Sequence, residues 1–309
     1  MTDVKTSPGF LHLHALNGGG EWLHMCIKHR ETSAYLMEVA MLDDLVVDAM
    51  IEEDTRSRVR VLDDGIMVLL KAMHVGQDMA RPEDMVSIRI WIDKTRVITT
   101  READVDPILA LHQKLSAGAG PTTPGEFLAD LIEEHLDEVD DHIEELEDAV
   151  NRIEGLVGTH QAEAACPNMA QTQSRISGFL RHLGPQKPVL EHLSRCKHSL
   201  LSERERTRID DGLDQLLRYL ETLQNLRDRV DILNDQVARI QDRQLTRSSF
   251  VFSVVATLFL PLGFIVSAFG VNLMGVPFEG HANGFTILMV ICLALVAGML
   301  VLFRWRKWF

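Results

Sequence analysis

The pattern of hydrophobic positions divides the chain into a mixed N-terminal part, a series of long amphipathic helices and two uninterrupted apolar runs. Before residue 120, segments 65–74, 86–93 and 96–100 are rich in β-branched residues and bounded by Asp, Gly and Pro, which is typical of strands. Residues 105–115 carry their apolar side chains at helical spacing. We therefore predict an α/β domain over residues 1–120.

After the breaker-rich stretch SAGAGPTTPG the hydrophobic period becomes helical. One helix is predicted over residues 126–157 and is broken by residues 158–167. A second helical run, to about residue 202, is interrupted by GPQKP because proline cannot continue a regular helix. The third run begins near Glu203, and its apolar residues recur every three or four positions, as packed helices require. These residues are Leu213, Leu216, Leu220, Leu223, Leu226, Val230, Leu233, Val237 and Ile240.

Two uncharged runs near the C-terminus, FVFSVVATLFLPLGFIVSAF and FTILMVICLALVAGMLVLF, are each long enough to cross a bilayer, which takes about 20 helical residues. Arg239, Arg243 and Arg247 precede the first run, RWRKW follows the second, and the segment between them has no Lys or Arg. The positive-inside rule therefore predicts cytoplasmic termini and an external loop. Nothing separates the third helical run from the first span, so we expect one continuous helix ~100 Å long at about 1.5 Å per residue.

These patterns together predict an α+β membrane protein in which an α/β domain precedes a helical stalk and two C-terminal spans. The predicted segments are a cytoplasmic α/β domain (1–120), a cytoplasmic helical stalk (121–249), transmembrane helix 1 (250–269), an external loop (270–284), transmembrane helix 2 (285–303) and a basic cytoplasmic tail (304–309).

Charge and motifs exclude two classes of function. The formal net charge is −14, and the excess of acidic residues lies before residue 250, which argues against a nucleic-acid partner. The four cysteines are far apart and show no CxxC spacing, so neither a disulfide framework nor a zinc knuckle is predicted. No P-loop, HExxH motif or nucleophile–base pair occurs, and no cofactor is expected. We therefore predict that the protein is not an enzyme.

Within the first predicted span, every third or fourth position is small or polar, while the other positions are mostly bulky and apolar. One interpretation is a seam along which membrane helices pack closely. The other is a helix that lines a water-filled path, since hydroxyl groups that face lipid find no hydrogen-bond partners there. This stripe consists of Thr246, Ser249, Ser253, Ala256, Leu260, Gly263 and Ser267.

Three aspartates continue the stripe into the stalk. Asp228, Asp235 and Asp242 are seven residues apart and lie nearly opposite the apolar stalk positions. Because one chain with two spans cannot enclose a pore, the path requires a symmetric oligomer around a shared axis. In such an oligomer the aspartates form stacked acidic rings beneath the pore.

The first span ends in Gly270-Val271-Asn272. Glycine ends a helix with little steric hindrance. In an oligomer the Asn272 amides form a ring whose oxygens can hold a hydrated cation without a formal charge. We therefore predict that these three residues form an entrance filter.

The segment FLPLGFIVSAFGVNLMGVP, the two terminal spans, the long stalk and the α/β domain resemble the CorA family of divalent cation transporters. The Gly-Val-Asn signature is more similar to the ZntB branch of that family than to the Gly-Met-Asn form. The resemblance implies a funnel-shaped homopentamer that takes up Zn²⁺ across the inner membrane. A magnesium, cobalt or nickel channel is an alternative, because Gly263 and Met274 depart from the family pattern. A membrane-anchored coiled-coil protein without transport is the alternative from another class.

Several residues are candidate metal ligands outside the pore. His135, Glu138 and His142 share one helix face, for which a solvated acidic surface is the preferred interpretation. His192, Cys196 and His198 form a second set, for which ordinary packing is preferred. His12 and His14 alternate as on one face of an exposed edge strand, and Glu279 and His281 lie in the external loop, where they could concentrate cations. These sets are His12, His14, His135, Glu138, His142, His192, Cys196, His198, Glu279 and His281.

Overall fold

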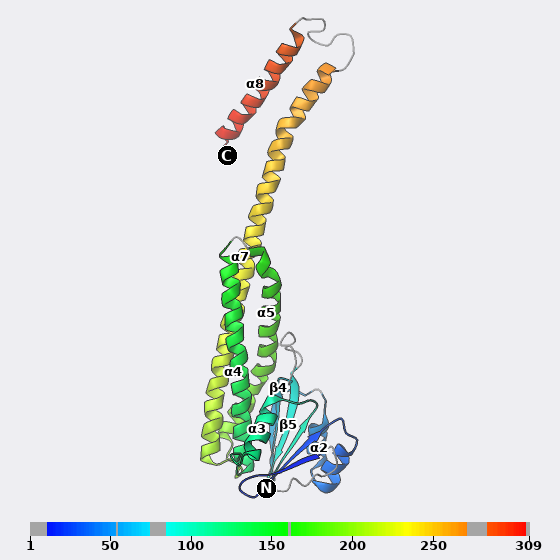
Figure 1. The fold of residues 1–309 in the computed structure, drawn as a ribbon, viewed down its shortest axis with the longest axis vertical. Coiled ribbons are helices and arrows are strands. Elements are labelled where there is room, and N and C mark those ends of the chain that lie inside the picture. Colours follow the sequence, from blue (N-terminus) through cyan, green and yellow to red (C-terminus); the bar gives the residue numbers. More distant parts are fainter. Residues whose placement is uncertain (1–10, 54, 75–84, 160–161, 271–282, 307–309) are drawn as a thin grey trace. The chain divides into compact units, whose positions relative to one another are not determined.

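The computed structural model describes residues 11–53, 55–74, 85–159, 162–270 and 283–306 (Figure 1). The chain forms two compact units, residues 1–235 and 236–309. The first contains a mixed sheet and most of the long helices, and the second contains the apolar helices. The predicted order of an α/β domain, a long stalk helix and two C-terminal apolar helices is confirmed.

The sheet has six strands in the order β1-β2-β6-β5-β4-β3. The β2–β6 pair is parallel and the other four pairs are antiparallel. The three strand segments predicted from the sequence correspond to β4, β5 and β6. The strands are β1 (Leu11–Ala15), β2 (Glu21–Cys26), β3 (Arg58–Val61), β4 (Ile66–Ala72), β5 (Val86–Ile92) and β6 (Arg96–Arg101).

Each face of the sheet is covered by helices, so most central-strand residues are buried on both faces. On one face, α1 (Glu31–Ala34), the π-helical turn η1 (Tyr35–Val39) and α2 (Asp44–Ile51) cover an apolar cluster around Met25 and Trp91. On the other face, Trp22 of β2 packs against Phe127, with ring centres 4.9 Å apart. Figure 1 shows α2 on one side of the sheet and α3 and α4 on the other.

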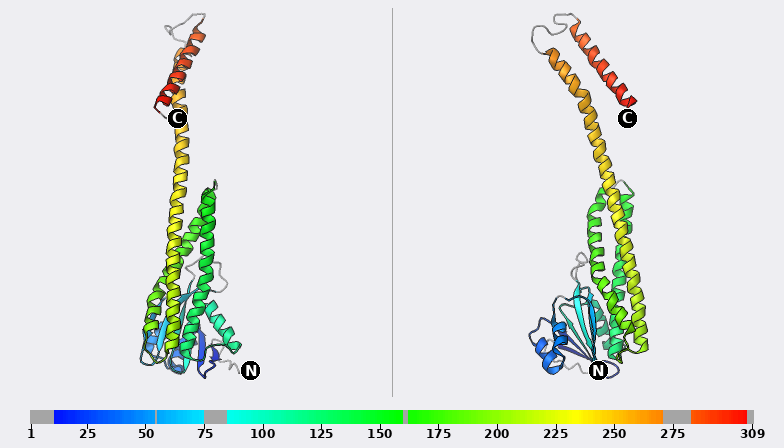
Figure 2. Two further views of the ribbon diagram at one scale, coloured as in Figure 1. Left: turned by 90° about the vertical axis from the view of Figure 1, so that its left-hand side faces the viewer. Right: turned by 180° about the vertical axis from the view of Figure 1, so that it is seen from behind.

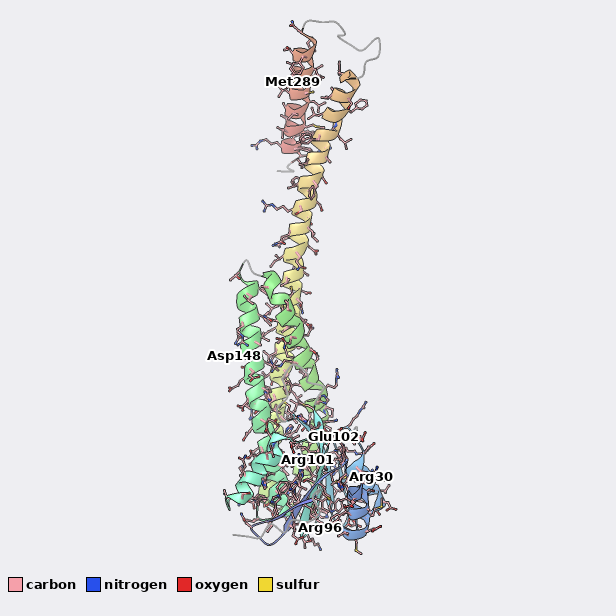
Figure 3. The ribbon with its side chains drawn as sticks, turned by 45° about the vertical axis from the view of Figure 1, so that its right-hand side comes forward. Arg30, Arg96, Arg101, Glu102, Asp148 and Met289 are labelled. Carbon is pink, nitrogen blue, oxygen red and sulfur yellow. The ribbon has the colours of Figure 1, made fainter. Side chains whose placement is uncertain are left out.

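Arg96, labelled in Figure 3, ties the start of β6 to the α1–α2 layer. Its Nε donates to Asp93 Oδ2 at 2.6 Å and its Nη2 donates to the carbonyl of Ala40 at 2.7 Å. A planar guanidinium can make both bonds at once, which fixes the loop before β6 against the segment between η1 and α2.

The helices begin and end close to the predicted residues. Pro167 is an exception: the break before α5 is shorter than predicted, and Pro167 lies inside that helix. The first three residues of GPQKP form the 3₁₀ turn η3 and the last two begin α6, so the stretch interrupts the helical run as predicted. The elements are α3 (Asp106–Ser116), α4 (Pro124–Val157), α5 (Ala162–Leu183), η3 (Gly184–Gln186), α6 (Lys187–Arg195), α7 (Glu203–Gly270) and α8 (Gly284–Trp305).

In the first unit, α4, α5 and α7 form a helical layer that the second view in Figure 2 shows beside the sheet. The predicted apolar stalk residues of α7 are buried, except Leu220 and Ile240, which are half-buried. Ion pairs bridge the helices at their polar edges. Arg208 of α7 donates to Asp130 Oδ1 at 2.6 Å and to Glu133 Oε1 at 2.7 Å, both on α4.

α7 is one helix of 68 residues, as the sequence predicted, and α8 has 22 residues. Both are long and apolar enough to cross a membrane. The two predicted spans lie within these helices.

Candidate ion path and metal-binding residues

All seven residues of the small and polar stripe lie on α7 and are exposed. The half-buried positions of the same segment lie on the opposite side of the helix, at about 100° per residue. They are Val254, Leu258, Pro261, Leu262, Ile265 and Phe269, whereas Phe250, which is also half-buried, lies between the two sides. The folded chain therefore leaves the stripe uncovered.

The hydroxyl groups in this segment are not equivalent. Thr257 lies outside the stripe, and its Oγ1 donates to the carbonyl of Ser253 at 2.7 Å, a bond within the helix. Pro261 has no N–H to offer the Thr257 carbonyl four residues earlier, which loosens the helix at this point. The stripe itself offers hydroxyls and backbone but no titratable group, so it suits passage of a hydrated ion better than tight chelation.

The first residue of the predicted filter, Gly270, lies at the C-terminal end of α7. Gly270 is the last residue of the helix, as predicted. The unpaired carbonyls of a helix C-terminus carry a partial negative charge, which attracts cations. Val271 and Asn272, and also Glu279 and His281 of the loop, lie outside the described residues, so their roles stay predictions.

The three aspartates below the span are exposed on α7. Asp228 and Asp235 belong to the first unit and Asp242 to the second. Leu226 and Leu233, on the opposite side of the helix, are buried. Asp228 Oδ1 also lies 3.8 Å from the guanidinium of the adjacent Arg227, but all three aspartates are exposed to solvent, as acidic rings require.

The face of α4 that carries His135 and Glu138 is not a solvated acidic surface, and that interpretation is wrong. His135 is buried, and its Nε2 lies 3.1 Å from Oε1 of Gln186, whose Nε2 donates to the Lys71 carbonyl at 2.9 Å. The Glu138 side chain is only 11% exposed. The reason is that these positions adjoin the apolar stripe of α4, which faces the other helices and the sheet.

Burial sets the charge of both groups. Burial lowers the pKa of His135 to about 4, although the hydrogen bond to Gln186 acts in the opposite direction. Burial, followed by the negative charge of Asp106, raises the pKa of Glu138 to about 8. Both side chains are therefore neutral near pH 7. Their nearest polar atoms, His135 Nδ1 and Glu138 Oε2, are 4.0 Å apart and make no hydrogen bond.

The other candidate ligands are not brought together. His142 is half-buried, 3.7 Å from Glu145 Oε2, and its ring packs near Phe179. His192 is exposed on α6, while Cys196 is buried and the His198 ring contacts the backbone of Asp63 and Leu200. Among the residues that the structure describes, no three His, Cys, Asp or Glu side chains are already placed to hold a metal ion.

His12 and His14 share one face of the edge strand β1, as predicted, but sequence reasoning did not place His24 and His112 beside them. His12 and His14 of β1, His24 of β2 and His112 of α3 lie at the β1 edge of the sheet, on the side of α4. We call these four residues the histidine cluster. The alternation in LHLHA and EWLHMC was a usable signal for three of them, but only the strand register brings them together, and α3 supplies the fourth.

Comparison with known proteins agrees with this architecture. Residues 17–307 match the model of the family described as CorA-like Mg²⁺ transporter protein. The zinc transport protein ZntB of Yersinia enterocolitica (serotype O:8 / biotype 1B) is 28% identical over 290 residues, which cover 93% of this chain and 87% of that protein.

Solved structures resemble the chain over nearly its whole length. The full-length CmaX protein matches with a TM-score of 0.78 and 27% identity, over 94% of this chain and 89% of that one. The CorA magnesium transporter of Methanocaldococcus jannaschii also matches with a TM-score of 0.78, over 93% and 90% of the two chains, but at 16% identity, which shows the fold alone.

Proposed function

Because the chain belongs to the CorA-like family of divalent-cation transporters, we propose that it carries Zn²⁺ across the inner membrane through a central pore lined by α7. Family membership places the protein among transporters rather than enzymes. Zinc is preferred to Mg²⁺, Ni²⁺ or Co²⁺ because of the Gly-Val-Asn signature and the similarity to the ZntB protein of Yersinia enterocolitica.

The proposed pore requires several copies of the chain, and we propose a homopentamer with cytoplasmic termini. One chain supplies two helices long enough to cross a membrane, and two helices cannot surround an aqueous path. In the pentamer the stripe of each α7 faces the axis, and α8 lies outside it. Asp228, Asp235 and Asp242 then form rings that draw cations along the axis, because like charges around one axis focus the field.

The observation that supports this arrangement most strongly is the position of the stripe on α7. Six small or polar residues and Leu260 occupy one exposed side of the helix, while most of the half-buried residues lie opposite. A tether that only anchored the first unit in the membrane would need no such separation, because lipid disfavours exposed hydroxyl groups.

A substitution pair tests the lining of the pore. Ser253→Leu places a bulky side chain on the stripe and should strongly reduce Zn²⁺ uptake by proteoliposomes. Val254→Leu places the same side chain on the half-buried side and serves as the control for a leucine at this level of the helix. Equal uptake by both variants, at unchanged pentamer mass, would show that the stripe does not line the path.

A second pair tests the entrance filter. Asn272→Ala removes the ring of amide oxygens that we propose to replace outer water around the ion, so uptake should fall strongly while the pentamer still assembles. Asn283→Ala is the control, since Asn283 precedes α8 and its side chain makes no capping hydrogen bond. If Asn272→Ala transports like the wild type, the Gly-Val-Asn segment only terminates the helix.

A further inference from the structure

The histidine cluster lies in the first unit, on β1, β2 and α3, and none of these elements carries a residue of the proposed ion path. His12 and His24 are directly opposed across the β1–β2 pair, and their ring centres are 6.4 Å apart. His14 is opposed to Trp22 on the same face, and its ring centre is 4.5 Å from that of His112 on α3. Four imidazoles from three elements thus share one corner of the sheet.

His24 has a buried nitrogen that the described residues leave without a partner. The residue is 5% exposed, and its Nδ1 lies 2.6 Å from Thr99 Oγ1, which also accepts a hydrogen bond from Trp22 Nε1 at 2.8 Å. These contacts fix the ring, but Nε2 is buried and has no hydrogen-bond partner. Buried polar atoms rarely lack a hydrogen-bond partner in folded proteins, because burial without a partner lowers the free energy of unfolding.

We propose that the histidine cluster binds a divalent transition-metal ion such as Zn²⁺, with His14 and His112 as the nearest pair of ligands and His12 and His24 completing the set. Imidazole nitrogen suits zinc and similar borderline ions. The cluster contains no carboxylate, so it offers Mg²⁺ none of the oxygen ligands that this ion prefers.

The spacing of the rings fits this chemistry. With Zn–N bonds of about 2.0 Å and tetrahedral angles, the ring centres of two histidines on one zinc ion lie about 5 Å apart. The 4.5 Å and 6.4 Å separations bracket that distance. The rings do not yet converge on one point, so binding requires them to turn. His12 is exposed and His14 is half-buried on an edge strand, so these two rings have room to move.

The charge state of the cluster also favours a metal. Burial lowers the pKa of His14 to about 4, and the neighbouring His112 and His12 act in the same direction. Burial, followed by the charge of Arg101, lowers the pKa of His24 well below its usual value. Both rings are therefore neutral at pH 7, and a metal ion need not displace a proton from them. Arg101 is itself paired with Asp104.

The contact between His24 Nδ1 and Thr99 Oγ1 resembles the hydrogen bonds that orient metal-binding histidines. A metal-binding histidine commonly holds its second ring nitrogen in a hydrogen bond, which fixes the tautomer and the direction of the ring. Thr99 occupies that position for His24, and Trp22 in turn fixes Thr99. Metal binding would thereby join the β1 edge, β2 and α3.

Binding of Co²⁺ to purified, chelator-treated full-length protein in detergent tests the proposal, because nitrogen-bound Co²⁺ has visible absorption bands. The wild type should bind one more Co²⁺ per chain than His12→Ala/His14→Ala, with bands that the double variant lacks. Zn²⁺ should remove these bands, and Mg²⁺ should not. The control His192→Ala/His198→Ala, which changes two histidines elsewhere in the unit, should bind like the wild type.

The readout does not depend on transport, so a protein that failed to carry zinc could still show this site. The single variant His12→Ala changes only an exposed side chain and should weaken Co²⁺ binding at least tenfold, which keeps the test valid if the double variant fails to fold. The proposal is overturned if His12→Ala binds Co²⁺ with wild-type affinity, if the folded double variant keeps the wild-type stoichiometry and bands, or if Mg²⁺ displaces Co²⁺ as readily as Zn²⁺ does.

Discussion

Replacement of the buried Glu138 by glutamine should stabilise the first unit increasingly as the pH rises. In the unfolded chain this carboxyl releases its proton near pH 4.5, whereas in the folded protein its pKa is raised to about 8 by burial and by Asp106. The folded state therefore holds the proton between these values, and the wild-type protein loses stability as the pH increases through that window. Glutamine has a similar shape and no proton to lose.

The expected magnitude follows from the two pKa values. Each pH unit between them costs the wild type about 1.4 kcal/mol, less near the ends of the window, so the change from pH 5.0 to pH 7.5 is about 3 kcal/mol. The half-buried His14 and the buried His24 and His135 have lowered pKa values and change stability in the opposite direction. The prediction therefore concerns the difference in unfolding free energy between the variant and the wild type at each pH.

Urea unfolding in detergent, followed by the fluorescence of Trp22 and Trp91 in the sheet, measures this difference. Trp305 and Trp308 should be replaced by phenylalanine in every protein compared, so that the signal comes from the first unit. Glu144→Gln, an exposed change on the same helix, is the control and should shift the unfolding free energy equally at both pH values. If Glu138→Gln also shows no pH-dependent difference, Glu138 is not held neutral by burial.

Further predictions concern packing between elements. Gly125→Ala would place a Cβ 2.2 Å from the Leu200 carbonyl oxygen and should cost about 1–3 kcal/mol in urea unfolding. Gly155→Ala, on the same helix with open space around it, should instead stabilise by about 0.5–1 kcal/mol; equal effects would refute the close approach. Arg208→Met removes the bonds to Asp130 and Glu133 and should cost about 1–3 kcal/mol, whereas Arg204→Met, at an exposed position, should be nearly neutral. Matching unfolding midpoints for the two arginine variants would show that this bridge does not hold α7 to α4.

The extent of the helices was predictable because their signals are local. The two uncharged runs and the regular spacing of Leu213 through Val237 leave few alternatives to a long helix that continues into a span. Pro167 was placed in a break because proline disfavours helix interiors, yet it lies in the second turn of α5, where its missing N–H removes one bond, to the carbonyl of Glu163.

The chemistry of the first unit was harder to predict because it depends on contacts between distant segments. His135 and Glu138 lie in the most acidic stretch of the chain, and their neighbours in sequence suggested solvent exposure. Their burial follows from packing of α4 against the turn that carries Gln186. Prediction of the histidine cluster would have required the register of β1 on β2 and the position of α3. No local sequence pattern indicates either of them.

The central claim is that the chain, as an oligomer, conducts divalent metal ions, and flux into liposomes tests it most directly. Purified wild-type protein should be reconstituted around a metal-sensitive fluorescent indicator and exposed in parallel to Zn²⁺, Ni²⁺, Co²⁺ and Mg²⁺. We predict Zn²⁺ entry well above that of protein-free liposomes and faster than Mg²⁺ entry. If the reconstituted pentamer passes none of the four ions, with or without an imposed pH gradient, the protein does not transport divalent cations and the spans serve only as an anchor.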